Sequence, residues 1–160
     1  MTKGELPYLG GIWITDLEQA EDMSKRSGGF VMPTLVVFFL GGLMVRVHVD
    51  FDEEDPRPEI TMQTMAYVME EDKILLSKPS DADEDPEIIE LPWRYRKRRL
   101  ELKDPEWWRF VAVTPDFAID ALKLPPNFFD VMKKMGDAGG FRYTPEPSVP
   151  GHPEARIGTR

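Results

Sequence analysis

The hydrophobic pattern of the chain is dominated by one uncharged stretch, residues 28–45, in which Thr34 is the sole polar side chain. A helix of about 18 residues is just long enough to approach the roughly 30 Å span of a hydrocarbon core. Gly41 and Gly42 would let neighbouring membrane helices pack closely against it. We therefore expect a single transmembrane helix at about residues 28–48, in a mostly α chain with short helices and extended arms.

The same stretch also carries the pattern of a β-hairpin. Residues 34–40 are rich in β-branched and aromatic side chains. Gly41 and Gly42 suit a two-residue hairpin turn, because glycine accepts positive φ. Residues 43–52 then alternate, with apolar side chains on one face and mostly polar ones on the other. This pattern favours the alternative, a soluble α+β fold built on a β-hairpin over residues 34–52.

Short helices are predicted on both sides of this stretch. Thr15 and Glu18 have the spacing of a capping box, which starts a helix of about residues 16–26. Gly28 can end this helix, because glycine accepts the left-handed conformation common after a helix. Residues 60–71 place methionines on one helical stripe, although their β-branched content also suits a strand, and we predict a helix there.

Two further helices are predicted toward the C-terminus. Thr114 caps the first and Pro115 occupies its first turn, so the helix runs to about residue 123. The second covers about residues 127–135 and is closed by Gly136. These boundaries rest on local chemistry alone.

The predicted elements divide the chain into four parts. Residues 1–27 form an N-terminal arm with a short helix, and residues 28–48 form the anchor or the hairpin. Residues 49–136 form a partner-binding region that is first acidic and then basic and aromatic, and residues 137–160 form an extended proline-rich tail. A tail of this composition cannot bury a core of its own, so we expect it to lie on partner surfaces.

The charge of the chain is strongly negative and unevenly distributed. The net charge is −9 at pH 7, which argues against a general nucleic-acid binder. Residues 46–92 carry a net charge of −11, and residues 93–109 carry a net charge of +4. The chain has no cysteine, which excludes disulfides, thiolate nucleophiles and thiolate metal sites.

Basic and aromatic side chains interleave in one segment, which we interpret as a docking surface. Tryptophan and tyrosine suit the headgroup depth of a membrane, and arginine suits lipid phosphates or acidic protein surfaces. We expect other protein subunits as partners, with anionic lipid headgroups as a second kind of partner and no nucleic acid. The docking residues are Trp93, Arg94, Tyr95, Arg96, Lys97, Arg98, Arg99, Trp107 and Trp108.

Two arrangements of polar residues resemble metal sites only weakly. On a strand, His48, Asp50 and Asp52 would project from one face. The second set loosely matches the pattern of metal-dependent nucleases, in which an acidic residue precedes Glu-x-Lys. Its members are Asp81, Glu101 and Lys103. We expect no catalytic, cofactor or metal site, and a metal-dependent hydrolase is the weakest alternative.

These features together predict a non-catalytic accessory or structural subunit of a large multi-subunit membrane complex of the energy-transducing kind. The expected location is a membrane, with the mitochondrial inner membrane as a candidate. If the hairpin forms instead, we expect a soluble α+β structural or interaction component of a virion or another multiprotein particle.

Overall fold

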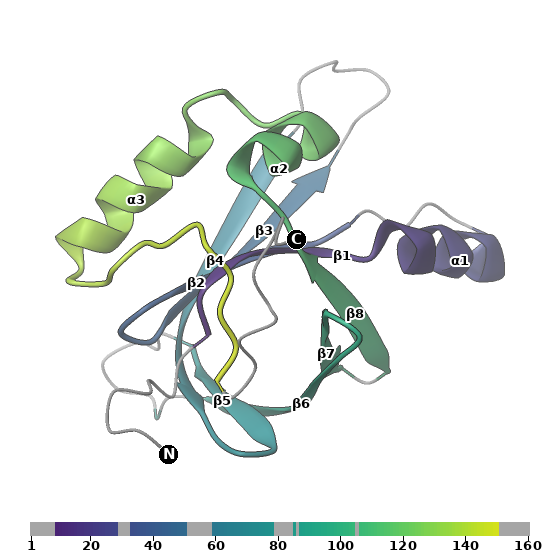
Figure 1. The fold of residues 1–160 in the computed structure, drawn as a ribbon, viewed down its shortest axis with the longest axis horizontal. Coiled ribbons are helices and arrows are strands. Elements are labelled where there is room, and N and C mark those ends of the chain that lie inside the picture. The colour runs from purple at the N-terminus through teal and green to yellow at the C-terminus, as the bar shows by residue number, and fades with distance from the viewer. Residues whose placement is uncertain are drawn as a thin grey trace.

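Eight antiparallel strands form a closed barrel in which each strand pairs with its neighbours in sequence and β8 returns to β1 (Figure 1). This computed structural model describes residues 9–28, 33–50, 59–78, 85, 87–104 and 106–150. The strands are β1 (Gly11–Thr15), β2 (Leu35–Phe39), β3 (Leu43–Asp50), β4 (Glu59–Met69), β5 (Lys73–Ser77), β6 (Ile88–Arg96), β7 (Arg99–Lys103) and β8 (Trp107–Ala112). The helices in the described part are α1 (Leu17–Ser27), α2 (Pro115–Leu122) and α3 (Phe128–Ala138).

The strands near α2 and α3 are buried on both faces. Side chains of one parity fill the barrel, where Trp13 and Phe38 are fully buried. Side chains of the other parity, such as Ile12 and Val37, belong to a second apolar cluster that includes residues of α2 and α3. A strand covered on both sides is apolar at nearly every position, which is why β2 reads as a continuous hydrophobic run.

The transmembrane helix predicted at residues 28–48 does not form, and the mostly α fold class was wrong. The described part of that range contains β2 and β3, which pair antiparallel from Leu35↔Val47 to Phe39↔Leu43. Among the described helices, none is both long and apolar enough to cross a membrane. Hydropathy did not separate the two structures, because a strand buried on both faces is as free of charge as a membrane span.

Gly41 and Gly42 form the turn between β2 and β3, so their predicted role in packing membrane helices was wrong. Their φ angles are 105° and 102°, which a two-residue hairpin turn requires. The hairpin offered as the alternative for residues 34–52 is present in its described part, but in a closed barrel, so the α+β class was wrong too. The prediction of a membrane-complex subunit rested on the transmembrane helix and is contradicted with it. The alternative, a component of a virion or another particle, rested on the α+β fold and is contradicted too.

Residues 60–71, predicted to be a helix, lie mostly in strand β4. This strand pairs with all eight residues of β3. Met65 and Met69 are buried in the barrel, whereas Met62, on the outer face, is 45% exposed. The helical stripe of methionines was misleading because β3 supplies the hydrogen bonds that keep this segment extended.

The local signals at the helix ends were partly right. Thr114 caps α2 and accepts a hydrogen bond from the Phe117 amide, as predicted. Gly28 ends α1 in the left-handed conformation, also as predicted. The cap of α1 is Asp16 and not Thr15, because the Thr15 hydroxyl bonds both backbone polar groups of Thr34, just before β2.

Gly136 lies inside α3 and does not close it, because α3 continues to Ala138. A Cβ atom on this glycine would lie 2.3 Å from Cε2 of Phe39. Glycine therefore serves the close approach of α3 to the outer face of β2, and the helix termination predicted from it was wrong.

The described part of the proline-rich tail packs on the barrel of its own chain. Isolated bridges join Leu40 to Arg142 and Gly10 to Ser148. Val149 is buried in the same cluster as the barrel interior. Residues 151–160 lie outside the described residues, and contact of this part with partners stays a prediction.

Candidate functional site

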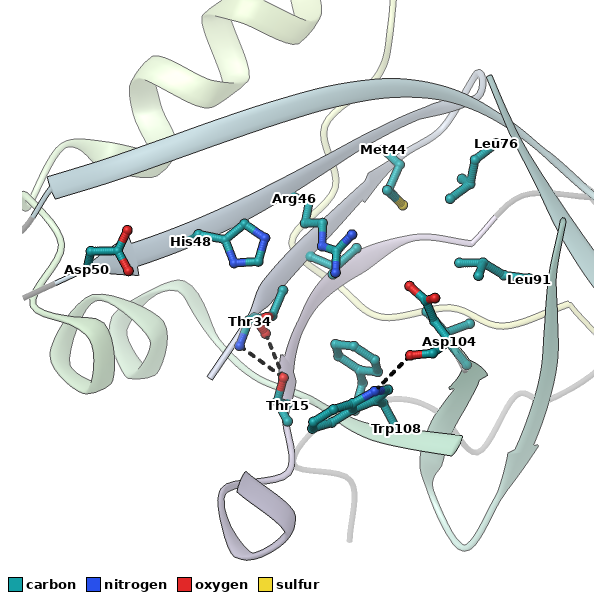
Figure 2. A pocket seen from close by; sticks show the side chains of 13 residues that line it. Thr15, Thr34, Met44, Arg46, His48, Asp50, Leu76, Leu91, Asp104 and Trp108 are labelled. Atoms are coloured by element: carbon teal, nitrogen blue, oxygen red, sulfur yellow. Dashed lines mark hydrogen bonds between the residues drawn. The ribbon is translucent and has the colours of Figure 1, made fainter. Parts of the chain in front are cut away.

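A cavity of about 460 Å³ lies in the barrel interior (Figure 2). Its lining comes from most strands of the barrel, because inward-pointing residues alternate along each strand. The lining residues are Thr15, Thr34, Val36, Met44, Arg46, His48, Asp50, Leu76, Leu91, Leu102, Asp104, Trp108 and Phe110.

Strand β3 gives the cavity a gradient of polarity. Asp50 is exposed, His48 and Arg46 are half-buried, and Met44 is buried. These four alternate positions share the inward face, and Figure 2 shows them in line along the strand. The cavity is therefore polar toward the Asp50 end of β3 and apolar deeper in the barrel.

The apolar part of the lining surrounds the deeper space. Leu76, Leu91 and Leu102 project inward from β5, β6 and β7, and all three are buried. Phe110 adds an aromatic ring from β8. A wall of this composition gains free energy when an apolar group replaces water against it.

Hydrogen bonds hold the other side of the cavity in place. The Trp108 indole Nε1 donates to the backbone oxygen of Asp104 at 3.1 Å, which fixes the ring at the rim. The Thr15 hydroxyl donates to the Thr34 oxygen at 3.2 Å and accepts from the Thr34 amide at 3.0 Å. Those side chains therefore form a preformed wall opposite β3 (Figure 2).

Arg46 brings a positive charge into the cavity. Its guanidinium extends from β3 into the space between that strand and Trp108 (Figure 2). Among the described residues, no carboxylate lies within ion-pair distance of it, whereas each of four arginines on the outer face of the barrel has one. Those are Arg94, Arg96, Arg99 and Arg109. A half-buried guanidinium without a carboxylate attracts an anion strongly, because its charge is only partly screened by water.

His48 is held in its neutral form by its surroundings. Burial lowers its pKa below the usual 6.5, the Arg46 charge lowers it further, and Asp50 opposes both effects. The imidazole is therefore uncharged at neutral pH and becomes a second cation beside Arg46 on acidification.

Acidification should destabilise the protein through His48. The unfolded chain takes up the proton near pH 6.5 and the folded chain only at lower pH, so the contribution of neutral His48 is complete above 6.5 and declines as the pH falls toward the folded pKa. We expect His48→Gln to flatten the fall in the free energy of unfolding across this window. Urea denaturation at a series of pH values measures it, and parallel curves for both proteins would contradict the lowered pKa.

The weak metal-site predictions gain no support from the geometry. His48 and Asp50 do share the inward face of β3, but Asp52 lies outside the described residues. In the part of the chain that the structure describes, no group of three His, Cys, Asp or Glu side chains could hold a metal ion. Asp81 also lies outside it, and Glu101 binds two arginines on the outer face.

The barrel divides the predicted docking residues between its two faces. Trp93, Tyr95 and Trp108 belong to the barrel interior or its rim. The other members lie on the outer face of β6–β8 or in the turn after β6. Those are Arg94, Arg96, Lys97, Arg98, Arg99 and Trp107. Sequence reasoning could not make this division without the strand parity.

Sequence reasoning also missed the cavity itself. The alternation over residues 43–52 singled out His48 and Asp50, and the same alternation placed Arg46 beside them. The leucines of the apolar wall come from strands distant in sequence, so no local signal unites them. Comparisons of the chain with protein-family models, with curated proteins and with solved structures gave no match.

Proposed function

We propose that this protein binds a small amphipathic molecule, with an apolar body and an acidic group, inside the barrel and without catalysing a reaction on it. The observation that carries the proposal is the cavity of about 460 Å³ whose apolar depth meets Arg46. An eight-stranded barrel is either filled by its own side chains or holds one small ligand. The volume lies within the range of about 300–1,000 Å³ that is usual for ligand pockets.

The apolar depth selects the body of the ligand. Met44 and the three leucines offer no hydrogen bond, so a polar group placed there would lose its contacts with water without replacement. An aliphatic or aromatic body gains about 25 cal/mol for each Å² of apolar surface that it buries. The ligand should therefore enter with its apolar end first.

Arg46 selects the acidic group. A guanidinium presents parallel N–H donors that match a carboxylate, and it stays charged at every physiological pH. His48 lies two residues farther along the inward face of β3 and would add a second positive charge on protonation. A carboxylate at the depth of Arg46 would leave the apolar body beside Met44, as the order of residues along the strand requires.

Titration with an environment-sensitive fluorescent fatty acid tests the proposal. We expect saturable binding to one site per chain, with energy transfer from Trp108 in the cavity wall. Arg46→Gln should weaken binding about tenfold, since it removes a charge-assisted hydrogen bond. Arg26→Gln, which removes an exposed arginine on α1, is the matched control and should leave the affinity unchanged.

Two further measurements separate binding in the cavity from binding elsewhere. Leu102→Trp fills part of the apolar depth and should abolish binding of the fatty acid while the protein stays folded. The methyl ester of the same probe should bind wild type and Arg46→Gln equally, because it carries no anion. If Leu102→Trp binds as well as wild type, the ligand does not occupy the barrel and the proposal fails.

A further inference from the structure

The outer face of β6–β8 carries an ordered set of arginines. Across the three strands, Arg94 lies opposite Glu101 and Glu101 opposite Arg109. In the next row, Arg96 lies opposite Arg99. All of these side chains have the outward parity, because the residues between them point into the barrel.

Two buried carboxylates position four of these arginines. Glu101 accepts hydrogen bonds from Arg94 and, at 3.1 Å, from Arg96. The side chains of the two carboxylates, Glu101 and Asp16, are only 7% and 9% exposed, whereas the side chains of the four arginines are 37–58% exposed. Asp16 accepts from Arg99 at 2.8 Å and lies 3.7 Å from Nε of Arg109. The two buried carboxylates therefore lie beneath the arginines and hold their guanidinium groups at the protein surface.

The arginines keep donors available for a further anion. The hydrogen bonds to Glu101 and Asp16 are made by Nε atoms, and within the described residues the Nη groups have no bonded acceptor. The Nη groups form the outer end of the guanidinium fork, which matches the two oxygens of a carboxylate. Two arginines would neutralise the two carboxylates. The ion pairs within this surface therefore leave two of the four positive charges uncompensated.

At the edges of this surface, one arginine is restrained by a tryptophan ring and a turn adds two further cations. The Arg94 guanidinium lies 3.9 Å from the centre of the Trp107 ring, a cation–π contact that restrains it. Lys97 and Arg98 form the exposed turn between β6 and β7 with φ angles of 54° and 63°. Asn–Gly would adopt that turn with less strain, so the turn carries two cations at a cost in stability.

We propose that this surface, which we term the arginine face, binds an acidic polypeptide segment of a protein partner. The cations of the arginine face are Arg94, Arg96, Lys97, Arg98, Arg99 and Arg109. Its six cations against two carboxylates leave an excess of positive charge on a chain whose net charge is −9. The net charge of the rest of the chain is negative, so a short acidic segment that stays within the face is favoured. A long nucleic acid or a broad anionic membrane would extend over the repelling surface. This proposal is independent of the ligand in the barrel.

A triple variant tests the arginine face without threatening the fold. Arg96→Gln removes the most exposed of the four paired arginines and leaves Arg94 on Glu101. Lys97→Asn with Arg98→Gly installs a relaxed hairpin turn. The matched control is Arg26→Gln with Lys133→Gln and Lys134→Gln, three exposed cations on α1 and α3. Both variants have the same net charge, so general repulsion of an acidic probe is equal.

The measurement is fluorescence anisotropy of a short fluorescein-labelled oligoglutamate peptide at about 50 mM salt, repeated at about 300 mM. We expect wild type and the control to bind alike, the face variant to bind about tenfold more weakly, and binding to fall at high salt. Equal losses in both variants would overturn the proposal. So would tighter binding of single-stranded DNA or of phosphatidylserine vesicles than of the peptide.

Discussion

Replacing Gly41 and Gly42 by valine together is expected to destabilise the protein by roughly 2–6 kcal/mol, because each β-branched residue would be forced to positive φ at a cost of roughly 1–3 kcal/mol. The turn aligns β2 with β3, and β3 carries the polar side of the cavity. A change of this size is a large share of the 5–15 kcal/mol that stabilises a typical domain. Urea denaturation followed by tryptophan fluorescence measures it.

The control for this experiment is Gly41→Asn, since asparagine tolerates positive φ at turns. It should cost much less than the double change, because the nearest atom to its Cβ would be Cδ1 of the Phe141 ring at 3.2 Å. A double-valine protein with the stability of wild type would show that the two glycines do not make this turn. Valine is neutral or favourable in a membrane helix, so this pair of variants also tests the correction of the fold.

Replacing Gly11 by alanine is expected to cost roughly 2–4 kcal/mol, from backbone strain and overpacking together. Gly11 has a φ of 101°, and a Cβ atom there would lie 2.6 Å from Cα of Pro147. That neighbour is a backbone atom, so no side-chain rotation can relieve the contact. The thermal unfolding midpoint should fall, and the described part of the tail should become accessible to proteolysis.

Gly28→Ala separates the two causes. Gly28 has a φ of 72°, but a Cβ atom on it would meet nothing within 4 Å. It should therefore show the strain without the collision, and the difference between the two variants reports the packing of the tail near Pro147 on β1. If both cost the same, the tail does not press on the barrel and its packing is not part of the fold's stability.

The alternation of side chains along a strand, which the sequence determines, places several residues of the site on one face. The alternation over residues 43–52 placed Arg46, His48 and Asp50 on one face, and the structure keeps them together. Turn and cap chemistry was equally local, so the turn at Gly41 and Gly42 and the cap at Thr114 could be anticipated. These features depend on backbone sterics and on neighbours within a few residues.

The tertiary structure decided which face is inside. On β3, Val45, Val47 and Val49 lie outside the barrel in the cluster shared with α2 and α3, and the polar face lines the interior. An alternating strand usually turns its apolar side to the only core available, which would leave this polar face in solvent. Here the helices supply a second apolar layer, and closure of β8 on β1 encloses the polar face. Both depend on contacts between residues far apart in the chain, which no local pattern encodes.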